Sequence, residues 1–280
     1  MTPEFPLAVI GGGHMARSLV AGLRARGWPA AAIAVSGPRA ETRAAFADAF
    51  GVDAFADNRD AARFAPTWVL AVKPQTLPVV CDELADLARA HRPLVVSIAA
   101  GVSTMQLAAW LGDGVPIVRC MPNLPASIGA GATAMFANAH VDAAARARVE
   151  ALLGALGTTA WLDDEAGMDA VTGVSGTGPA YLFLLAEAMQ AAAVREGLDA
   201  ATARALIAQT LVGASRLLQE SGEAPAELRR RVTSPGGTTQ AAMGVFDRGG
   251  FVPLVGAAIA AATRRGAELA AQVARPEATA

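Results

Sequence analysis

The 280-residue sequence has few of the residues that mark several common protein classes. Its two cysteines, Cys81 and Cys120, are too few for a disulfide scaffold, and its three separated histidines match no metal-ligand spacing. Only 17% of residues are charged and the formal net charge is −2, so neither nucleic acid nor an anionic membrane is an expected partner. The longest apolar run, 251–262, is shorter than the roughly 18–20 residues that span a bilayer. The N-terminus has no basic segment typical of a signal peptide, so we expect a cytoplasmic protein without a metal centre.

The first half of the sequence alternates short apolar runs with stretches that have apolar residues at helical spacing. Continuously apolar runs such as "WVLAV" are typical of strands buried on both faces. The alternation predicts a parallel sheet covered by helices on both faces, a Rossmann-type doubly wound α/β fold. The expected strands are 7–11, 33–37, 68–72, 94–100, 116–121 and 131–137, and the expected helices between them are 14–27, 39–50, 77–90 and 103–112.

After "TTAWLDD" (158–164) the strand patterns stop, and long helical patterns rich in alanine and leucine follow. Gly197 predicts a helix stop and Asp199 an N-cap, which separates helices over 179–197 and 199–221. Two further helices are expected after Gly237. We therefore predict an α/β domain over 1–162 and an all-α domain over 163–280.

The first strand is followed directly by a glycine-rich turn and a helix. Gly11, Gly13 and Ala16 form G-x-G-x-x-A within "AVIGGGHMARSLVAGL". Glycines at these positions let the backbone approach a pyrophosphate, which then lies at the positive end of the helix. In this context the motif predicts dinucleotide binding at residues 1–162. A glycine turn in an unrelated α/β domain is the alternative.

The end of the second strand indicates which dinucleotide binds. NAD sites usually carry an acidic residue there for the ribose 2′-hydroxyl, but here the first acid is Glu41, inside the next expected helix. Ser36 can donate to a phosphate and Arg39 can neutralise one. A charge-assisted hydrogen bond of this kind changes affinity about ten- to a hundredfold, so the sequence favours NADP(H) over NAD(H). The alternative for Arg39 is a solvated arginine at a helix start.

Two more segments follow strands at the edge where doubly wound sheets hold ligands, "AVKPQ" (71–75) and "SIAAG" (97–101). Pro74 ends its strand and leaves Lys73 at the tip, although a surface lysine is an ordinary alternative. In the helical half, "VTSPGGTT" (232–239) places Gly236 and Gly237 just before a helix, an arrangement that binds an anion.

The sequence shows no nucleophile–base pairing and no carboxylate pair in a shared motif. Hydride transfer needs little protein chemistry, because the cofactor carries the reactive atom. Such an enzyme needs a substrate that is already electrophilic. A cyclic iminium with a carboxylate meets this need, because the positive charge on nitrogen activates the carbon, and the anion site at 234–239 would hold the carboxylate.

These segments together resemble the pyrroline-5-carboxylate reductase family, which makes L-proline with NAD(P)H. The likeness covers about residues 7–272 and includes "GGGHMA", "AVKPQ", "SIAAGVS", "RCMPNLPASIGAGATA", "DAVTGVSGTGPAY", "VTSPGGTT" and "DRGGF" in the family's order. The resemblance implies an N-terminal dinucleotide-binding domain and a helical domain that forms a dimer, which in the family often assembles to a decamer. The family uses NADPH or NADH, and the end of the second strand favours NADPH as the preferred cofactor here, with NADH as the alternative.

The resemblance also assigns residues. The cofactor would contact Gly11, Gly12, Gly13, His14, Met15, Ala16, Ser36, Arg39, Asn58, Ala71, Val72, Lys73, Pro74, Ile98, Ala99 and Ala100. The substrate would contact Glu165, Ser234, Gly236, Gly237, Thr238 and Thr239. Within this set, Thr239 would bond the imine nitrogen as the catalytic residue and Glu165 would lie near the substrate amine. The alternative for Glu165 is a charge favoured at a helix N-terminus.

Two positions depart from the family pattern. His14 stands where the family usually has asparagine, which puts a pyrophosphate bond from that side chain in doubt. Thr177 stands where serine is commoner, but it keeps the hydroxyl.

Rival functions differ in the residues that they need. Hydroxyacid or prephenate dehydrogenases need a lysine or histidine in the helical domain, and residues 165–280 contain neither. A reductase of a related cyclic imino acid and a non-catalytic NADP(H)-binding regulator stay open. A regulator that only binds NADP(H) would not need the second anion site at "SPGGTT".

Overall fold

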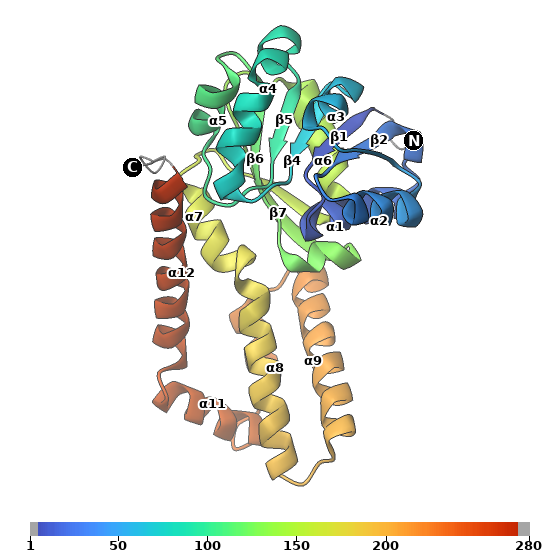
Figure 1. Ribbon diagram of the computed structural model, residues 1–280. Coiled ribbons are helices and arrows are strands. Elements are labelled where there is room, and N and C mark those ends of the chain that lie inside the picture. Colours follow the sequence, from blue (N-terminus) through green and yellow to red (C-terminus); the bar gives the residue numbers. More distant parts are fainter. Residues whose placement is uncertain (1–4, 274–280) are drawn as a thin grey trace, which may run out of the picture. The chain divides into compact units, whose positions relative to one another are not determined.

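The computed structural model describes residues 5–273 (Figure 1). The described residues up to Thr177, together with those from Ala260 onward, form one compact unit. Gly178–Ile259 form the other. The predicted division at 162 and 163 stays a prediction.

The first unit contains an eight-stranded sheet with the order β3-β2-β1-β4-β5-β6-β7-β8. All six predicted strands are present, and two short strands, β3 and β8, are additions that were not among them. The strands are β1 (Leu7–Ile10), β2 (Ile33–Ser36), β3 (Asp53–Phe55), β4 (Thr67–Leu70), β5 (Leu94–Ser97), β6 (Ile117–Met121), β7 (Gly131–Ala137) and β8 (Gly157–Trp161).

The expectation of an entirely parallel sheet was wrong at one place, because β6 and β7 pair antiparallel. The linker between them, 122–130, contains only the short 3-10 helix η3 (Leu124–Ile128). A parallel pair needs a crossover of about a dozen residues or more, usually a helix, so this linker can only reverse the chain. The other neighbouring strands are parallel.

Helices cover both faces of this sheet, which confirms the doubly wound fold (Figure 1). One face packs on α1 (His14–Ala25), α2 (Ala40–Phe50) and α6 (Ala143–Gly154), and the other on α3 (Asn58–Phe64), α4 (Leu77–His91) and α5 (Thr104–Leu111). Alternation along β1 produces the two layers, since Leu7 and Val9 enter the first core and Ala8 and Ile10 the second.

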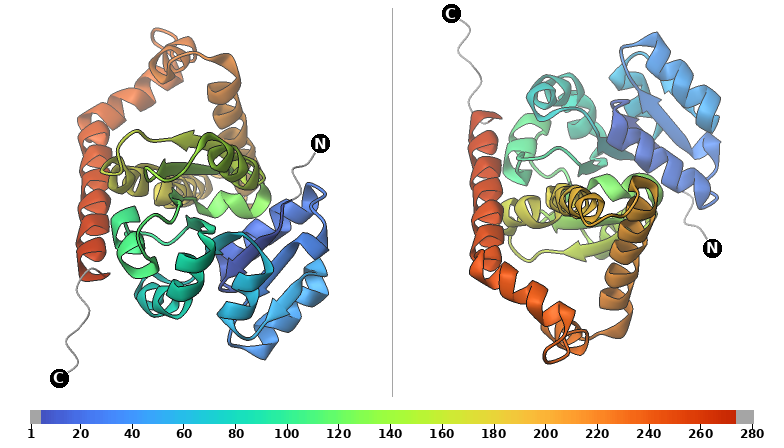
Figure 2. Two further views of the ribbon diagram at one scale, coloured as in Figure 1. Left: turned by 90° about the horizontal axis from the view of Figure 1, so that it is seen from above. Right: turned by 90° about the horizontal axis from the view of Figure 1, so that it is seen from below.

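After β8 the chain is helical, as the sequence predicted. The helices after β8 are α7 (Gly167–Val171), the π-helix η4 (Thr172–Gly176), α8 (Gly178–Arg195), α9 (Ala200–Ser221), α10 (Pro225–Arg231), α11 (Thr238–Arg248) and α12 (Phe251–Val273). Gly197 has φ +98° and Asp199 caps α9 by accepting from Thr202 N (3.0 Å), so both predicted boundary signals are confirmed. α12 is one continuous helix (Figure 2), and the short α10 was not expected.

The second unit buries very little of its own apolar surface. α8 and α9 pack side by side (Figure 1), yet only Ala203 and Ile207 are buried within residues 178–259, all of which the structure describes. Large apolar side chains stay exposed here: Leu182, Phe183, Leu184, Leu206, Val212, Val245, Phe246, Val252 and Leu254. Exposed apolar surface on this scale is typical of an interaction surface.

Of the helices described, none is by itself long and apolar enough to cross a membrane, while the bent pair of α11 and α12 meets the criterion by length and composition only.

Candidate functional site

The glycine turn after β1 is held tightly against the next strands. Gly11 has φ +106°, and a Cβ there would lie 2.8 Å from Val72 Cγ1 and 2.9 Å from Ala71 O. A Cβ at Gly12 would lie 2.6 Å from Thr42 Cγ2. Gly11 is therefore required by packing and by conformation, and Gly12 by packing. Within residues 5–273 no side chain caps α1, whose N-cap is Gly13, so the first turn of this helix can receive an anion.

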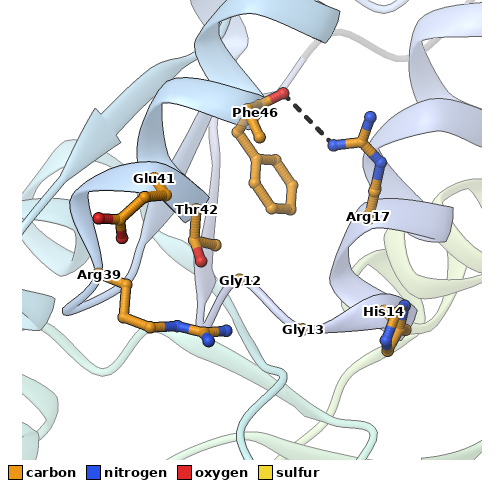
Figure 3. Close-up of a pocket in the computed structure, with 9 residues that line it drawn as sticks. Gly12, Gly13, His14, Arg17, Arg39, Glu41, Thr42 and Phe46 are labelled. Carbon is orange, nitrogen blue, oxygen red and sulfur yellow. Dashed lines mark hydrogen bonds between the residues drawn. The ribbon is translucent and has the colours of Figure 1, made fainter.

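A pocket of about 440 Å³ opens beside this turn (Figure 3). Arg39, from the loop after β2, and Arg17, from α1, both line it, and Arg17 Nη1 donates to the carbonyl oxygen of Ala45 (3.3 Å). Two guanidinium groups beside an uncapped helix N-terminus form a site suited to phosphate. The lining residues are Gly12, Gly13, His14, Arg17, Arg39, Glu41, Thr42, Ala45 and Phe46.

Sequence reasoning identified Arg39 but not Arg17. The spacing in the sequence could have indicated Arg17. It lies three residues after His14, a predicted cofactor contact, and therefore on the same face of α1.

Ser36 lies beneath the glycine turn and does not line the pocket. Its side chain is fully buried, and its Oγ accepts from Gly11 N (3.3 Å) and donates to Asn58 Oδ1 (2.7 Å). The amide of Asn58 in turn donates to Glu83 Oε2 (2.9 Å). This chain of hydrogen bonds ties the end of β2 to α3 and α4. A direct bond from Ser36 to the cofactor stays a prediction.

The loops after β4 and β5 share the sheet edge with the glycine turn, because β1, β4 and β5 are parallel neighbours. Ala71 and Val72 pack on Gly11, and Lys73 is exposed where it begins η2 (Pro74–Thr76). In the next loop Ile98 N donates to Leu70 O (3.2 Å), Ala99 is buried, and Ala100 is exposed. The structure thus brings these three predicted segments to one edge.

Glu165 has its partners inside the first unit. It lies two residues before α7, and its Oε2 accepts from Thr104 Oγ1 (2.7 Å) while Oε1 accepts from Thr104 N (2.8 Å). Arg119 Nη1 is 3.2 Å from the same Oε1, and Arg119 Nη2 is 3.7 Å from Asp169 Oδ1. The carboxylate therefore binds the first residue of α5, and neither Thr104 nor Arg119 was identified from the sequence.

The segment that leads into α8 is attached to the end of β6. Asn123 Nδ2 donates to Ser175 O (3.3 Å), and a Cβ at Gly176 would lie 2.5 Å from Met121 Cε. Thr177 Oγ1 donates to the carbonyl of Gly173 (2.8 Å). π-Helical turns such as η4 are frequent at functional sites. The neighbouring Cys120 is fully buried, which raises the pKa of its thiol well above the ordinary value.

The second predicted anion site has the expected geometry. Gly236 has φ +71°, Gly237 N donates to Ser234 O (3.0 Å), and Gly237 is the N-cap of α11. No side chain from the described residues caps this helix. Thr239, half-buried, is its second residue. Gly236 N also donates within the chain, to Gln240 Oε1 (2.6 Å). The N–H groups in the first turn of α11 can receive a carboxylate, and the role of this segment in substrate binding stays a prediction.

Comparisons with known proteins agree with this layout. Residues 165–269 match the family model described as pyrroline-5-carboxylate reductase dimerisation, and residues 6–101 match NADP oxidoreductase coenzyme F420-dependent. A curated pyrroline-5-carboxylate reductase of Pseudomonas aeruginosa is 51% identical over 95% of this chain and 97% of its own length. The structure of a pyrroline-5-carboxylate reductase from Coxiella burnetii is 41% identical, with TM-score 0.91 over 95% of this chain and 99% of that one.

A more distant structure, a Plasmodium falciparum pyrroline carboxylate reductase with NADP bound, is 26% identical, with TM-score 0.84 over 95% of this chain and 98% of that one. Sequence identity over nearly the whole length, the matching dimerisation model and the shared fold lead to one assignment. This chain belongs to the pyrroline-5-carboxylate reductase family.

Proposed function

We propose that this chain reduces the C=N bond of 1-pyrroline-5-carboxylate with NADPH to give L-proline, the last step of proline biosynthesis. The observation that carries the proposal is the 51% identity to the Pseudomonas aeruginosa reductase over 95% of the chain. Two helix N-termini without a side-chain cap, those of α1 and α11, support the proposal, because the reaction needs a dinucleotide site and a second anion site.

The residues around the glycine turn fit a dinucleotide phosphate. A side chain at Gly11 or Gly12 would collide with neighbouring protein atoms, so only glycine allows the tight turn that leads from β1 into α1. We assign the pyrophosphate to the N-terminus of α1 and the additional phosphate of NADPH to Arg39 and Arg17. This assignment predicts a preference for NADPH over NADH. When bound, the cofactor supplies the hydride that forms the new C–H bond at the imine carbon.

The turn before α11 is assigned to the substrate. The N–H groups of Gly237 and Thr238 would bind the carboxylate, with Ser234 nearby, and Gly237 N would give up its hydrogen bond to Ser234 O for this contact. The Thr239 hydroxyl would bond the ring nitrogen. Hydride addition to a neutral imine would leave a nitrogen anion, so the nitrogen must be protonated at or before transfer. We propose that the iminium forms with a solvent proton and that Thr239 orients it, since positioning alone can lower a barrier by several kcal/mol.

Self-association follows from the exposed apolar helices of the second unit. Residues 178–259 bury only two side chains, whereas a stable helical layer needs an apolar face covered. We propose a dimer through these helices that assembles further to a decamer, measurable by sedimentation velocity. We also propose that it works in the cytoplasm, where its two free cysteines stay reduced.

The deciding experiment is steady-state kinetics of the purified chain with 1-pyrroline-5-carboxylate, with NADPH and NADH compared. NADPH oxidation that depends on the imine and yields L-proline supports the proposal. Faster turnover of a six-membered cyclic imino acid would instead indicate the related reductase. Binding of NADPH without turnover of any imine would indicate the non-catalytic regulator.

A further inference from the structure

We infer that Glu165 is a positioning residue of the cofactor site, which holds the loop 98–103 in place through the N-terminus of α5, rather than a ligand of the substrate amine. The inference rests on the proposed function only for the identity of the cofactor. Everything else comes from contacts within the first unit.

The hydrogen bonds at the start of α5 leave one place for Glu165. Ser103 and Gln106 form a capping box, with Ser103 N donating to Gln106 Oε1 (2.8 Å) and Gln106 N donating to Ser103 Oγ (3.2 Å). Thr104 N is outside this box and donates to Glu165 Oε1 (2.8 Å), 61 residues away in sequence. The second oxygen accepts from Thr104 Oγ1 (2.7 Å), so both carboxylate oxygens bind one residue. A negative charge at this end of α5 is also favoured by the helix dipole.

Arg119 connects the same carboxylate to the other end of the loop. It lies on β6 directly opposite Ser97, the last residue of β5, from which the loop 98–103 begins. The Arg119 side chain is only 9% exposed and that of Glu165 20%, so the pair is well shielded from water. The ion pair therefore links both ends of the loop. Arg119 lies on the strand beside its start, and Glu165 binds Thr104 just after its end.

These contacts also argue against a substrate role. Glu165 Oε1 accepts from two donors and Oε2 from one, and its charge is paired with Arg119, which also lies near Asp169. A substrate amine would have to compete with a buried guanidinium, and a buried charge that loses its partner is strongly destabilised. The carboxylate therefore acts on the cofactor through α5 and the loop that precedes it.

The test compares three variants by direct NADPH fluorescence titration, by KM for the imine and by thermal unfolding. Thr104→Val removes the hydroxyl donor and keeps the ion pair, Thr104→Ser keeps the hydroxyl, and Glu165→Gln removes the charge. We expect the Kd for NADPH to rise about tenfold in Thr104→Val and more in Glu165→Gln, since hydrogen bonds to charged groups are strong. Thr104→Ser should restore binding to within about threefold, and KM for the imine should stay within about twofold of wild type. Glu150→Gln is the control, because Glu150 also accepts a side-chain hydrogen bond, from Trp161, but is exposed and lies on α6.

The outcomes separate the two roles. If Glu165 bound the substrate amine, Glu165→Gln would raise KM for the imine, leave NADPH binding unchanged, and share no effect with Thr104→Val. That pattern overturns the inference, as does equal NADPH affinity in all variants. If Glu165→Gln does not fold, the two Thr104 variants decide alone. Wild-type protein that binds NADPH but reduces no imine refutes the proposed function and still allows this test, whereas wild-type protein that binds no NADPH refutes both.

Discussion

Gly11 offers the sharpest test of how the fold builds the proposed cofactor site. Replacement by alanine places a methyl group 2.8 Å from Val72 Cγ1 and 2.9 Å from Ala71 O, on a backbone with φ +106°. Both the conformation and the contacts oppose the substitution. Gly27 provides a matched control, because it has φ +84° but a Cβ there meets nothing within 4 Å.

The two effects can be given magnitudes. A left-handed backbone costs an alanine about 1–2 kcal/mol, which both variants should lose. Overpacking adds about 1–3 kcal/mol, and only Gly11→Ala should show it, because the carbonyl of Ala71 belongs to the backbone and moves little. For a domain of about 150–250 residues, 1 kcal/mol shifts the Tm by about 2–4 °C. Gly11→Ala should therefore unfold about 2–12 °C below Gly27→Ala.

The assay is thermal unfolding of both variants at equal protein concentration, followed by NADPH titration. Because the glycine turn carries the proposed pyrophosphate site, Gly11→Ala should also weaken NADPH binding about tenfold or more, while Gly27→Ala should bind as wild type does. Equal Tm values for the two variants would show that the turn relaxes freely. The packing argument would then be wrong.

Four further outcomes are expected. Thr239→Ala should lower kcat about ten- to a thousandfold. The control Thr238→Ala keeps its backbone N–H and should have a kcat close to that of wild type. A kcat of Thr239→Ala within about twofold of wild type would contradict the proposed bond from Thr239 to the ring nitrogen. Arg39→Ala should raise KM for NADPH about tenfold and leave KM for NADH nearly unchanged, and parallel changes in both would contradict the phosphate assignment. Thr67→Val should raise the free energy of unfolding by about 1 kcal/mol in urea titrations, because the buried Thr67 hydroxyl has no hydrogen-bond partner among the described residues. Burial raises the pKa of Cys81 to about 12, so its thiolate forms only in strong alkali, and iodoacetamide should label the native protein at neutral pH far more slowly than the unfolded chain.

Local patterns were enough for much of the fold. The turn at Gly11, the strand β4 and the N-cap at Asp199 each depend on a few consecutive residues, and each is found where the sequence predicted it. The turn at Gly237 also follows from adjacent residues, since a glycine N-cap and the helix after it are neighbours in the chain. Such features are determined by conformation and hydrophobic period, which the sequence displays directly.

Strand pairing depended on tertiary structure. β3 is only three residues long and half exposed, so it becomes a strand by pairing with β2 rather than by its own composition. The antiparallel direction of β7 likewise has no signal within Gly131–Ala137, because direction depends on the partner and on the linker. Neither could be predicted from local patterns.

The polar contacts of the site show the same division. The sequence by itself determined the glycine turn before α1 and the second glycine turn before α11, because each is a short run of consecutive residues. Only the tertiary structure decided that Ser36 is buried against Asn58, that Arg17 joins Arg39, and that Glu165 binds Thr104. Those partners lie 22 residues apart for each of the first two pairs and 61 for the third. Hydrogen bonds and ion pairs act over a few ångströms, so partners this distant in sequence meet only after the sheet has assembled.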